Sequence, residues 1–255
     1  MTARHVERST VLWQVAFGAG LLLAWHACGL VFGTAWISSP GLVGKRLGDW
    51  MTHDAIYLHT ATTVAEMLAG LAAGVVLGAV CGILLGMSRL VANVLRPLVF
   101  AVYSIPLVSL APLLIMIFGI DMLPKIVLVA TVVFFLVLFN TMKGVDLVDP
   151  DTIDVLRLMG GTWDESFRKV LLPGCMVWIL SGVKVALPYA LVAATVGEMM
   201  ASRRGLGLLL SESGQKFDVT SIYAVLFILT VLGLVIAETG NRLEGTLLRW
   251  RRKHD

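Results

Sequence analysis

The chain has 255 residues, of which 58% are apolar and only 15% are charged, and its mean hydropathy is +0.87. Soluble domains carry about 25% charged residues, so this composition excludes an ordinary soluble enzyme, a disordered tail protein and a free nucleic-acid binder. The net charge is only +3, and Cys28, Cys81 and Cys175 form no CxxC pair, which argues against a disulfide framework or a cysteine metal centre. The sequence predicts an all-α integral membrane protein.

Six stretches are long and apolar enough to cross a bilayer as helices of about 20 residues. In chain order they cover about residues 11–33, 64–87, 98–120, 125–142, 174–200 and 222–239. The first is longer than the apolar core of a signal peptide and is not followed by a small-residue cleavage site, so we interpret it as a span. We expect a single transmembrane domain over residues 1–255.

The positive charges predict how these spans are oriented. Lys and Arg gather on the cytoplasmic side of membrane proteins. With the N-terminus inside, the inner segments hold 13 of these residues and the outer segments hold six. Both termini are therefore expected in the cytoplasm. The longest inner connection, about residues 146–173, is too long for a simple turn.

Glycines recur every four residues in the second stretch, at Gly70, Gly74, Gly78, Gly82 and Gly86. Small residues at this spacing let a neighbouring helix approach closely in a membrane. The stripe predicts a tight packing seam; whether that seam also slides during transport stays open.

The third stretch contains Pro106 and Pro112, follows Pro97 and has two serines, which mark it as a candidate pathway segment. Pro106 removes a backbone donor, and hydroxyls such as those of Ser104 and Ser109 can satisfy the freed carbonyls. The stretch is either a statically kinked helix or a broken helix beside a transport pathway.

Charged residues within spans are costly and often functional. Glu66 and Glu198, the latter next to Met199, lie near the outer ends of the second and fifth stretches. They are either boundary residues that face the surface or residues of an outer gate. Lys184 lies 14 residues before Glu198, which is too far along a helix for a direct pair. It either extends its amine towards the inner surface or contributes to the pathway.

The segment 146–173 is predicted to form a helix, a glycine pair and a second helix at the membrane surface. Pro150 suits a helix start, Gly160 and Gly161 break the run, and Thr162 with Glu165 has the spacing of a capping box. Exposed acidic, basic and apolar groups on such an element are suited to docking another protein.

These features resemble the permease subunits of binding-protein-dependent ABC importers, in particular the nitrate, sulfonate and taurine branch. Asp154-Val155-Leu156, then Gly160, then Leu172-Pro173 match the spacing of that family's "EAA…G…LP" cytoplasmic loop. The run SIPLVSLAPLLIMIFGID at 104–121 and the Gly197-Glu198-Met199 motif also fit, and the resemblance covers about residues 58–210.

The resemblance implies a type I ABC importer-like fold and a specific set of partners. These are a second permease copy, two ATP-binding subunits, an extracytoplasmic substrate-binding protein and the lipid of the bacterial inner membrane, with no nucleic acid. ATP and Mg²⁺ are expected on the partner subunits and no cofactor on this chain, which contains no G-x-x-x-x-G-K-[ST] motif. The permease itself would not be an enzyme. The residues implied to contact the ATP-binding subunit are Ile153, Asp154, Val155, Leu156, Arg157, Gly160, Gly161, Thr162, Leu172 and Pro173.

Two departures from the family pattern are informative. Asp154 replaces the usual Glu, and Val155 with Leu156 replaces two alanines, which implies an adjusted groove on the partner. Glu66 stands where many members of the branch carry Arg, so an anionic substrate is not implied. Sulfonates, nitrate-like anions, bicarbonate and small heterocycles all use permeases resembling this one.

A stand-alone transporter or channel driven by an ion gradient is the alternative function. Lys184 and Glu198 would then be relay candidates. The sequence shows no internal repeat between its halves and no paired broken helices, which are typical of such transporters.

Overall fold

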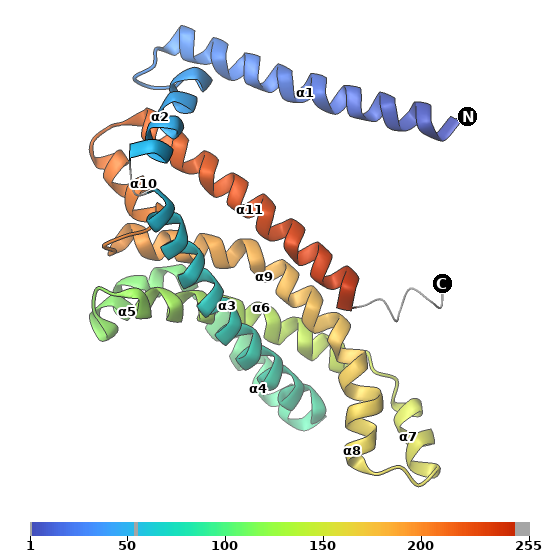
Figure 1. Cartoon of the computed structure of the whole chain (residues 1–255). Coiled ribbons are helices and arrows are strands. Elements are labelled where there is room, and N and C mark those ends of the chain that lie inside the picture. Colours follow the sequence, from blue (N-terminus) through green and yellow to red (C-terminus); the bar gives the residue numbers. More distant parts are fainter. Residues whose placement is uncertain (1, 54–55, 248–255) are drawn as a thin grey trace. The chain divides into compact units, whose positions relative to one another are not determined.

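The computed structural model describes residues 2–53 and 56–247, and in this part of the chain all regular structure is helical (Figure 1). Five helices are long and apolar enough to cross a membrane: α1 (Thr2–Phe32), α3 (Ile56–Met87), α6 (Met122–Asp146), α9 (Leu172–Met200) and α11 (Val219–Leu247). A bent helix pair, α4 and α5, makes a sixth candidate span. The chain is thus a multi-pass membrane protein, as its composition predicted.

The span expected over residues 98–120 is a broken helix rather than a kinked one, and its start was placed too late. Helix α4 (Arg89–Tyr103) begins earlier, and it is separated from α5 (Ala111–Phe118) by a short 3-10 turn, η1 (Leu107–Leu110). The two halves are bent by 70°. Pro106 lacks a backbone N–H and disfavours helical geometry at Ile105, so the helix cannot continue through this point.

The chain divides into two compact units. Unit 1 comprises Met1–Tyr57 and Leu209–Leu229, and unit 2 comprises Leu58–Leu208 and Thr230–Asp255. In unit 1, the short helix α2 (Pro40–His53) is joined to the residues that open α11. Arg46 pairs with Asp218 at 3.0 Å, and the Ser38 and Thr220 hydroxyls are hydrogen-bonded at 2.9 Å.

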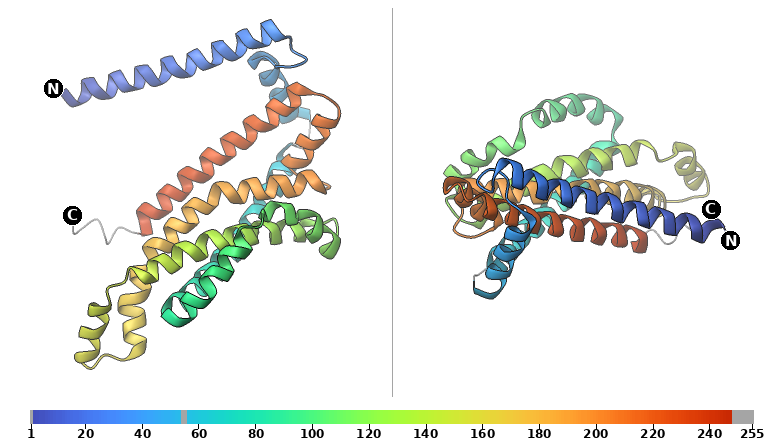
Figure 2. Two further views of the ribbon diagram at one scale, coloured as in Figure 1. Left: turned by 180° about the vertical axis from the view of Figure 1, so that it is seen from behind. Right: turned by 90° about the horizontal axis from the view of Figure 1, so that it is seen from above.

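The centre of unit 2 is α6, which packs extensively against α9 and is the most buried of the long apolar helices (Figures 1 and 2). On another side, the glycine stripe of α3 lies directly on α6. A Cβ atom at Gly74 or Gly78 would stand 2.6 Å from a backbone carbonyl oxygen of α6, of Ala130 or Phe134 respectively. The packing interpretation of the stripe is therefore confirmed.

The two ends of unit 2 carry different features. At one end, where α3 and α6 finish and α9 begins, lie α7 (Pro150–Leu158), α8 (Trp163–Ser166) and one π-helical turn, η2 (Phe167–Leu171). We call this the loop end. Helix α10 (Leu206–Gln215) begins at the opposite end, where α3 and α6 start and α9 finishes. Each end holds one candidate functional site.

Candidate functional site

The loop end is built on two short helices with well-defined termini. The Asp149 side chain caps α7 by accepting from the Asp151 N–H, and Pro150 occupies the first helical position, as expected. At the other terminus, the Gly160 N–H donates to the Arg157 carbonyl and the Gly161 N–H to the Leu156 carbonyl. This pair of bonds is a Schellman motif.

Both glycines of this motif are required by the geometry. Gly160 has a φ of +84°, in the left-handed region that side chains disfavour. A Cβ atom at Gly161 would stand 2.7 Å from the Leu156 carbonyl oxygen. The helix expected over residues 153–162 consequently ends at Leu158, and Thr162 belongs to the next helix.

Helix α8 begins with the predicted capping box. The Glu165 N–H donates to the Thr162 hydroxyl, and the Thr162 N–H donates to the Glu165 carboxylate at 3.0 Å. The rings of Trp163 and Phe167 stack with centroids 5.7 Å apart. Leu172 and Pro173 then open α9, as the Leu-Pro motif suggested. Figure 1 shows α7 and α8 side by side at the loop end.

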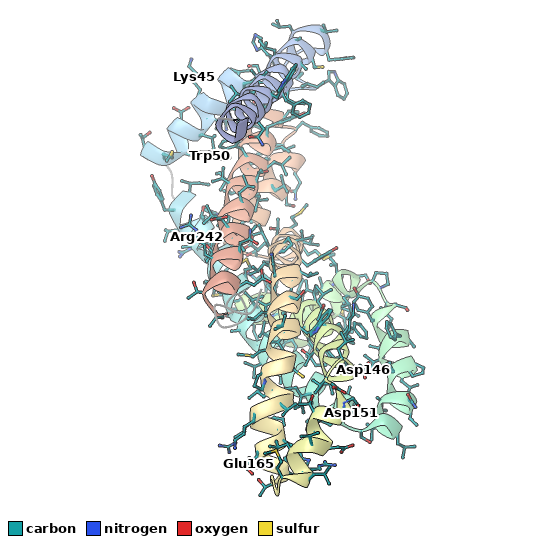
Figure 3. All side chains as sticks on the ribbon, turned by 90° about the vertical axis from the view of Figure 1, so that its right-hand side faces the viewer. Lys45, Trp50, Asp146, Asp151, Glu165 and Arg242 are labelled. Carbon is teal, nitrogen blue, oxygen red and sulfur yellow. The ribbon has the colours of Figure 1, made fainter. Side chains whose placement is uncertain are left out.

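The loop end presents apolar side chains on a mixed-charge surface. Leu158 is 88% exposed and Met159 is 80% exposed, and Val155 and Trp163 are also exposed. Acidic groups surround them, and Figure 3 shows Asp146, Asp151 and Glu165 gathered at this end. A cavity of about 420 Å³ lies behind α7, and Ile153, Asp154 and Arg157 line it together with residues from the ends of α3 and α6. Exposed apolar groups ringed by polar ones are typical of a protein docking surface.

The opposite end of unit 2 holds a buried charge cluster, which we define as Glu66, Lys125 and Glu198. The two glutamates have no exposed surface and Lys125 is 3% exposed. Lys125 Nζ lies 2.6 Å from Glu66 Oε1, so residues from α3 and α6 form an ion pair in the interior. The interpretation of the glutamates as surface-facing boundary residues is therefore wrong.

Glu198 links this cluster to the turn that follows α9. It accepts hydrogen bonds from the Thr63 hydroxyl at 2.7 Å and from the Gly207 N–H at 2.7 Å. Lys125 also donates to the Ser202 hydroxyl at 2.9 Å. The cluster thus holds together the ends of α3, α6 and α9 and the first turn of α10.

The sequence placed Glu66 and Glu198 near one membrane surface, but it did not reveal Lys125 or Thr63 as their partners. Lys125 is one of the six Lys and Arg residues that the charge distribution assigns to the outer segments. It is nonetheless the only basic residue at the edge of a predicted span on the same side as both glutamates. A basic residue in that position is the feature of the sequence from which a buried ion pair could have been predicted.

The burial of Glu66 changes what its charge implies. The argument from Glu in place of Arg requires a side chain exposed at the outer opening of the pathway. There the sign of its charge would attract or repel an ionic substrate. Because Glu66 is buried and lies 2.6 Å from Lys125 Nζ, it presents no charge to such an opening.

The remaining pathway candidates lie at separate places. Ser104, Pro106 and Ser109 are all at the break between α4 and α5, where both serine hydroxyls donate to local backbone carbonyls. Met199 is partly exposed at the end of α9. Lys184 is exposed and pairs with Glu244 of α11 at 2.9 Å.

A helical membrane domain with a broken span and an exposed helix–glycine–helix loop is the architecture of a transport permease. Residues 74–245 match the family described as "Binding-protein-dependent transport system inner membrane component". The chain belongs to this family.

Curated relatives carry ABC transporter permease names. The riboflavin transport system permease protein RibX of Chloroflexus aurantiacus is 32% identical over 240 residues, which is 94% of this chain and 86% of that protein. The formylaminopyrimidine transport permease protein ThiX of Halalkalibacterium halodurans is 28% identical, over 91% of this chain and 93% of that protein. The putative aliphatic sulfonates permease SsuC of Bacillus subtilis is 28% identical, over 96% and 85% respectively.

The fold agrees with that of solved ABC importers. The inward-facing MetNI methionine ABC transporter has a chain that matches with a TM-score of 0.66 at 22% identity, over 75% of this chain and 96% of that chain. The chain is accordingly a transmembrane permease subunit of an ABC importer with a type I permease fold. The alternative of a stand-alone ion-driven transporter is not supported.

Proposed function

We propose that the loop end is the docking site for an ATP-binding subunit and that α7 is its coupling helix. The supporting observation is the geometry of α7: it is capped at both termini, and its last turn exposes Leu158 and Met159. A short helix that is rigid and apolar at its tip can fit a groove on a partner and transmit the partner's movement. Leu172 and Pro173 connect the loop directly to α9.

We further propose the assembly in which this loop works. Two copies of the permease form the pathway, two ATP-binding subunits bind and hydrolyse ATP with Mg²⁺, and an extracytoplasmic protein delivers a small polar solute. The chain needs no cofactor of its own and catalyses no reaction. It lies in the bacterial inner membrane, with both termini and the loop end in the cytoplasm.

The coupling role is tested by a series of variants at Gly160. Asn tolerates a positive φ far better than a β-branched residue. No atom lies within 4 Å of the position of a Gly160 Cβ, so backbone strain is the main local effect of a side chain. We expect Gly160→Val to abolish substrate-stimulated ATP hydrolysis in the purified complex, and Gly160→Asn to retain a large part of it.

A matched control is available at Gly33, which also has a φ of +82° and no atom within 4 Å of its Cβ position. Gly33→Val should leave the coupling of ATP hydrolysis to transport intact. The ATP-binding subunit should co-purify with the wild-type chain. Normal uptake by Gly160→Val, or a chain that purifies from its native membrane without an ATP-binding subunit, would overturn the proposal.

The names of the relatives define the first substrates to test. RibX and ThiX are named for heterocycles and SsuC for sulfonates. The test is uptake of radiolabelled riboflavin, formylaminopyrimidine and an alkanesulfonate, measured with the cognate binding protein. It distinguishes a heterocycle substrate from a sulfonate substrate.

A further inference from the structure

The hydrogen bonds around Glu198 provide donors to both of its carboxyl oxygens. The Thr63 hydroxyl donates to this carboxylate, at 2.7 Å from Oε1 and 3.0 Å from Oε2. Thr63 Oγ1 itself accepts from the Leu206 N–H at 2.9 Å, and its hydroxyl also lies 3.2 Å from the His59 carbonyl oxygen. The Gly207 N–H donates to Oε2. Both oxygens of Glu198 are therefore acceptors, and the carboxylate sits at the start of α10, where the helix dipole stabilises a negative charge.

The carboxyl group of Glu66, unlike that of Glu198, has few hydrogen-bond donors around it. Lys125 Nζ lies 2.6 Å from its Oε1, but no backbone N–H or hydroxyl in the described part of the chain donates to either oxygen. Glu66 and Glu198 are both fully buried in the same cluster, and each carboxyl group acts on the electrostatics of the other. Two ionised carboxylates that share one buried cluster with a single Lys would repel each other in a site from which water is excluded.

The charge balance of the cluster also argues against two ionised glutamates. With all three groups ionised, the buried charge cluster has one positive and two negative charges. A further acid, Asp121 at the start of α6, adds negative potential rather than relieving it. His59 of α3 is hydrogen-bonded to the backbone of Gly205, and Arg203 and Arg204 of the turn are exposed, so no described side chain supplies a second buried positive charge.

We propose that the buried charge cluster is a proton-binding site, in which one proton resides on Glu66 and is donated to the Glu198 carboxylate. Glu66 Oε1 then accepts from Lys125, Glu66 Oε2–H donates to Glu198, and Lys125 and Glu198 carry opposite charges that cancel. Every acceptor on the two carboxyl groups has a partner, and the site as a whole is neutral.

The site joins the ends of three spans, so proton binding and the arrangement of these ends are linked. If the turn of residues 201–205 separates from α3 as the pathway opens, water reaches Glu66 and the proton passes to the solvent on that side. This consequence rests on the proposed transport function, whereas the proton site itself does not.

Infrared spectroscopy tests the site directly. The full-length chain, purified in detergent with the subunits that remain bound to it, should show the carbonyl stretching band of a protonated carboxylic acid at neutral pH. This band should be lost in Glu66→Gln and kept in Glu238→Gln, which removes an exposed carboxylate paired with Arg242. A spectrum unchanged by Glu66→Gln, or a band lost in Glu198→Gln but kept in Glu66→Gln, would overturn the assignment.

Thermal unfolding of the same variants provides an independent test. Gln at position 66 keeps a neutral group that can donate to Glu198, so Tm should stay within about 2 °C of wild type. Lys125→Met leaves the Glu198 carboxylate without a counter-charge, so it should lower Tm by roughly 6 °C or more. In Glu198→Gln, by contrast, the Glu66 carboxyl can ionise and pair with Lys125. The double variant Lys125→Met/Glu198→Gln should recover part of the loss caused by Lys125→Met. A Glu66→Gln variant as unstable as Lys125→Met would contradict the proposal. This outcome is separate from any result on ATP coupling, because no transport is measured.

Discussion

Gly205 shows how a single residue permits the buried charge cluster to form. Its φ is +134°, and a side chain at this position would overlap the carboxyl group of Glu198. The turn after α9 can therefore fold back onto α3 only with glycine here. The position of the Glu198 carboxylate depends on this turn as much as on the helix that carries it.

A second residue-scale feature is Asp218, which lies just before α11 in unit 1. Partial burial acts to raise its pKa, but the hydrogen bonds from Ser221 and the nearby Arg46 outweigh that effect and hold the pKa below its ordinary value of 3.8. Because the folded-state pKa is the lower one, the ion pair stabilises unit 1 fully above pH 3.8. This stabilisation is lost as the pH falls through the folded-state value.

The Asp218 pair gives a pH-dependent prediction. Hydrogen exchange in α2 should be unchanged between pH 7 and pH 5, after correction for the intrinsic rate, and should accelerate below about pH 4. Asp218→Asn should show the accelerated exchange already at pH 7. Glu212→Gln, which removes only an exposed pair with Lys216, is the control. Protection of α2 that is insensitive to Asp218→Asn would show that the pair does not hold this helix.

At the scale of elements, the contact between α3 and α6 depends on the absence of side chains. The glycines meet Val129, Val133, Val137, Thr141 and Val145 of α6 in turn. Since β-branched side chains have few rotamers, this surface of α6 is rigid and the two backbones fit closely. The contact places Glu66 of α3 beside Lys125 of α6.

The Gly78 position tests this packing. A methyl group there would stand 2.6 Å from a backbone oxygen that cannot rotate away, so Gly78→Ala should destabilise the chain by about 1–3 kcal/mol. Ala73 is exposed on the same helix, and Ala73→Val should change stability little. The measurement is thermal unfolding in detergent. Equal stability of the two variants would show that the helices move apart without cost.

At the scale of the whole molecule, the distribution of positive charges predicts the orientation in the membrane. Lys45 of α2 and Asp151 of α7 are both exposed and are labelled in Figure 3. After replacement of the three native cysteines by alanine, a cysteine at position 151 should react with an impermeant maleimide only in inside-out vesicles. A cysteine at position 45 should react only from the outside of intact cells. The reverse labelling pattern would invert the proposed topology.

The sequence by itself determined the class of protein and the loop end. Apolar length, loop charge and the order of the cytoplasmic motifs are local properties, and caps such as Asp149 and Thr162 act within one helical turn. The positions of α7, of the Schellman glycines and of the capping box could therefore be predicted, with an error of a few residues at the end of α7.

Only the tertiary structure decided which distant residues meet. Hydropathy located Glu66, Lys125, Lys184 and Glu198 along their spans, but it did not show which side of a helix faces a neighbour. The structure pairs Lys184 with Glu244 and brings Glu66, Lys125 and Glu198 into one site. These contacts depend on helix rotation and on close packing at the glycine stripe. Both are set by the fit between helices that are far apart in the sequence.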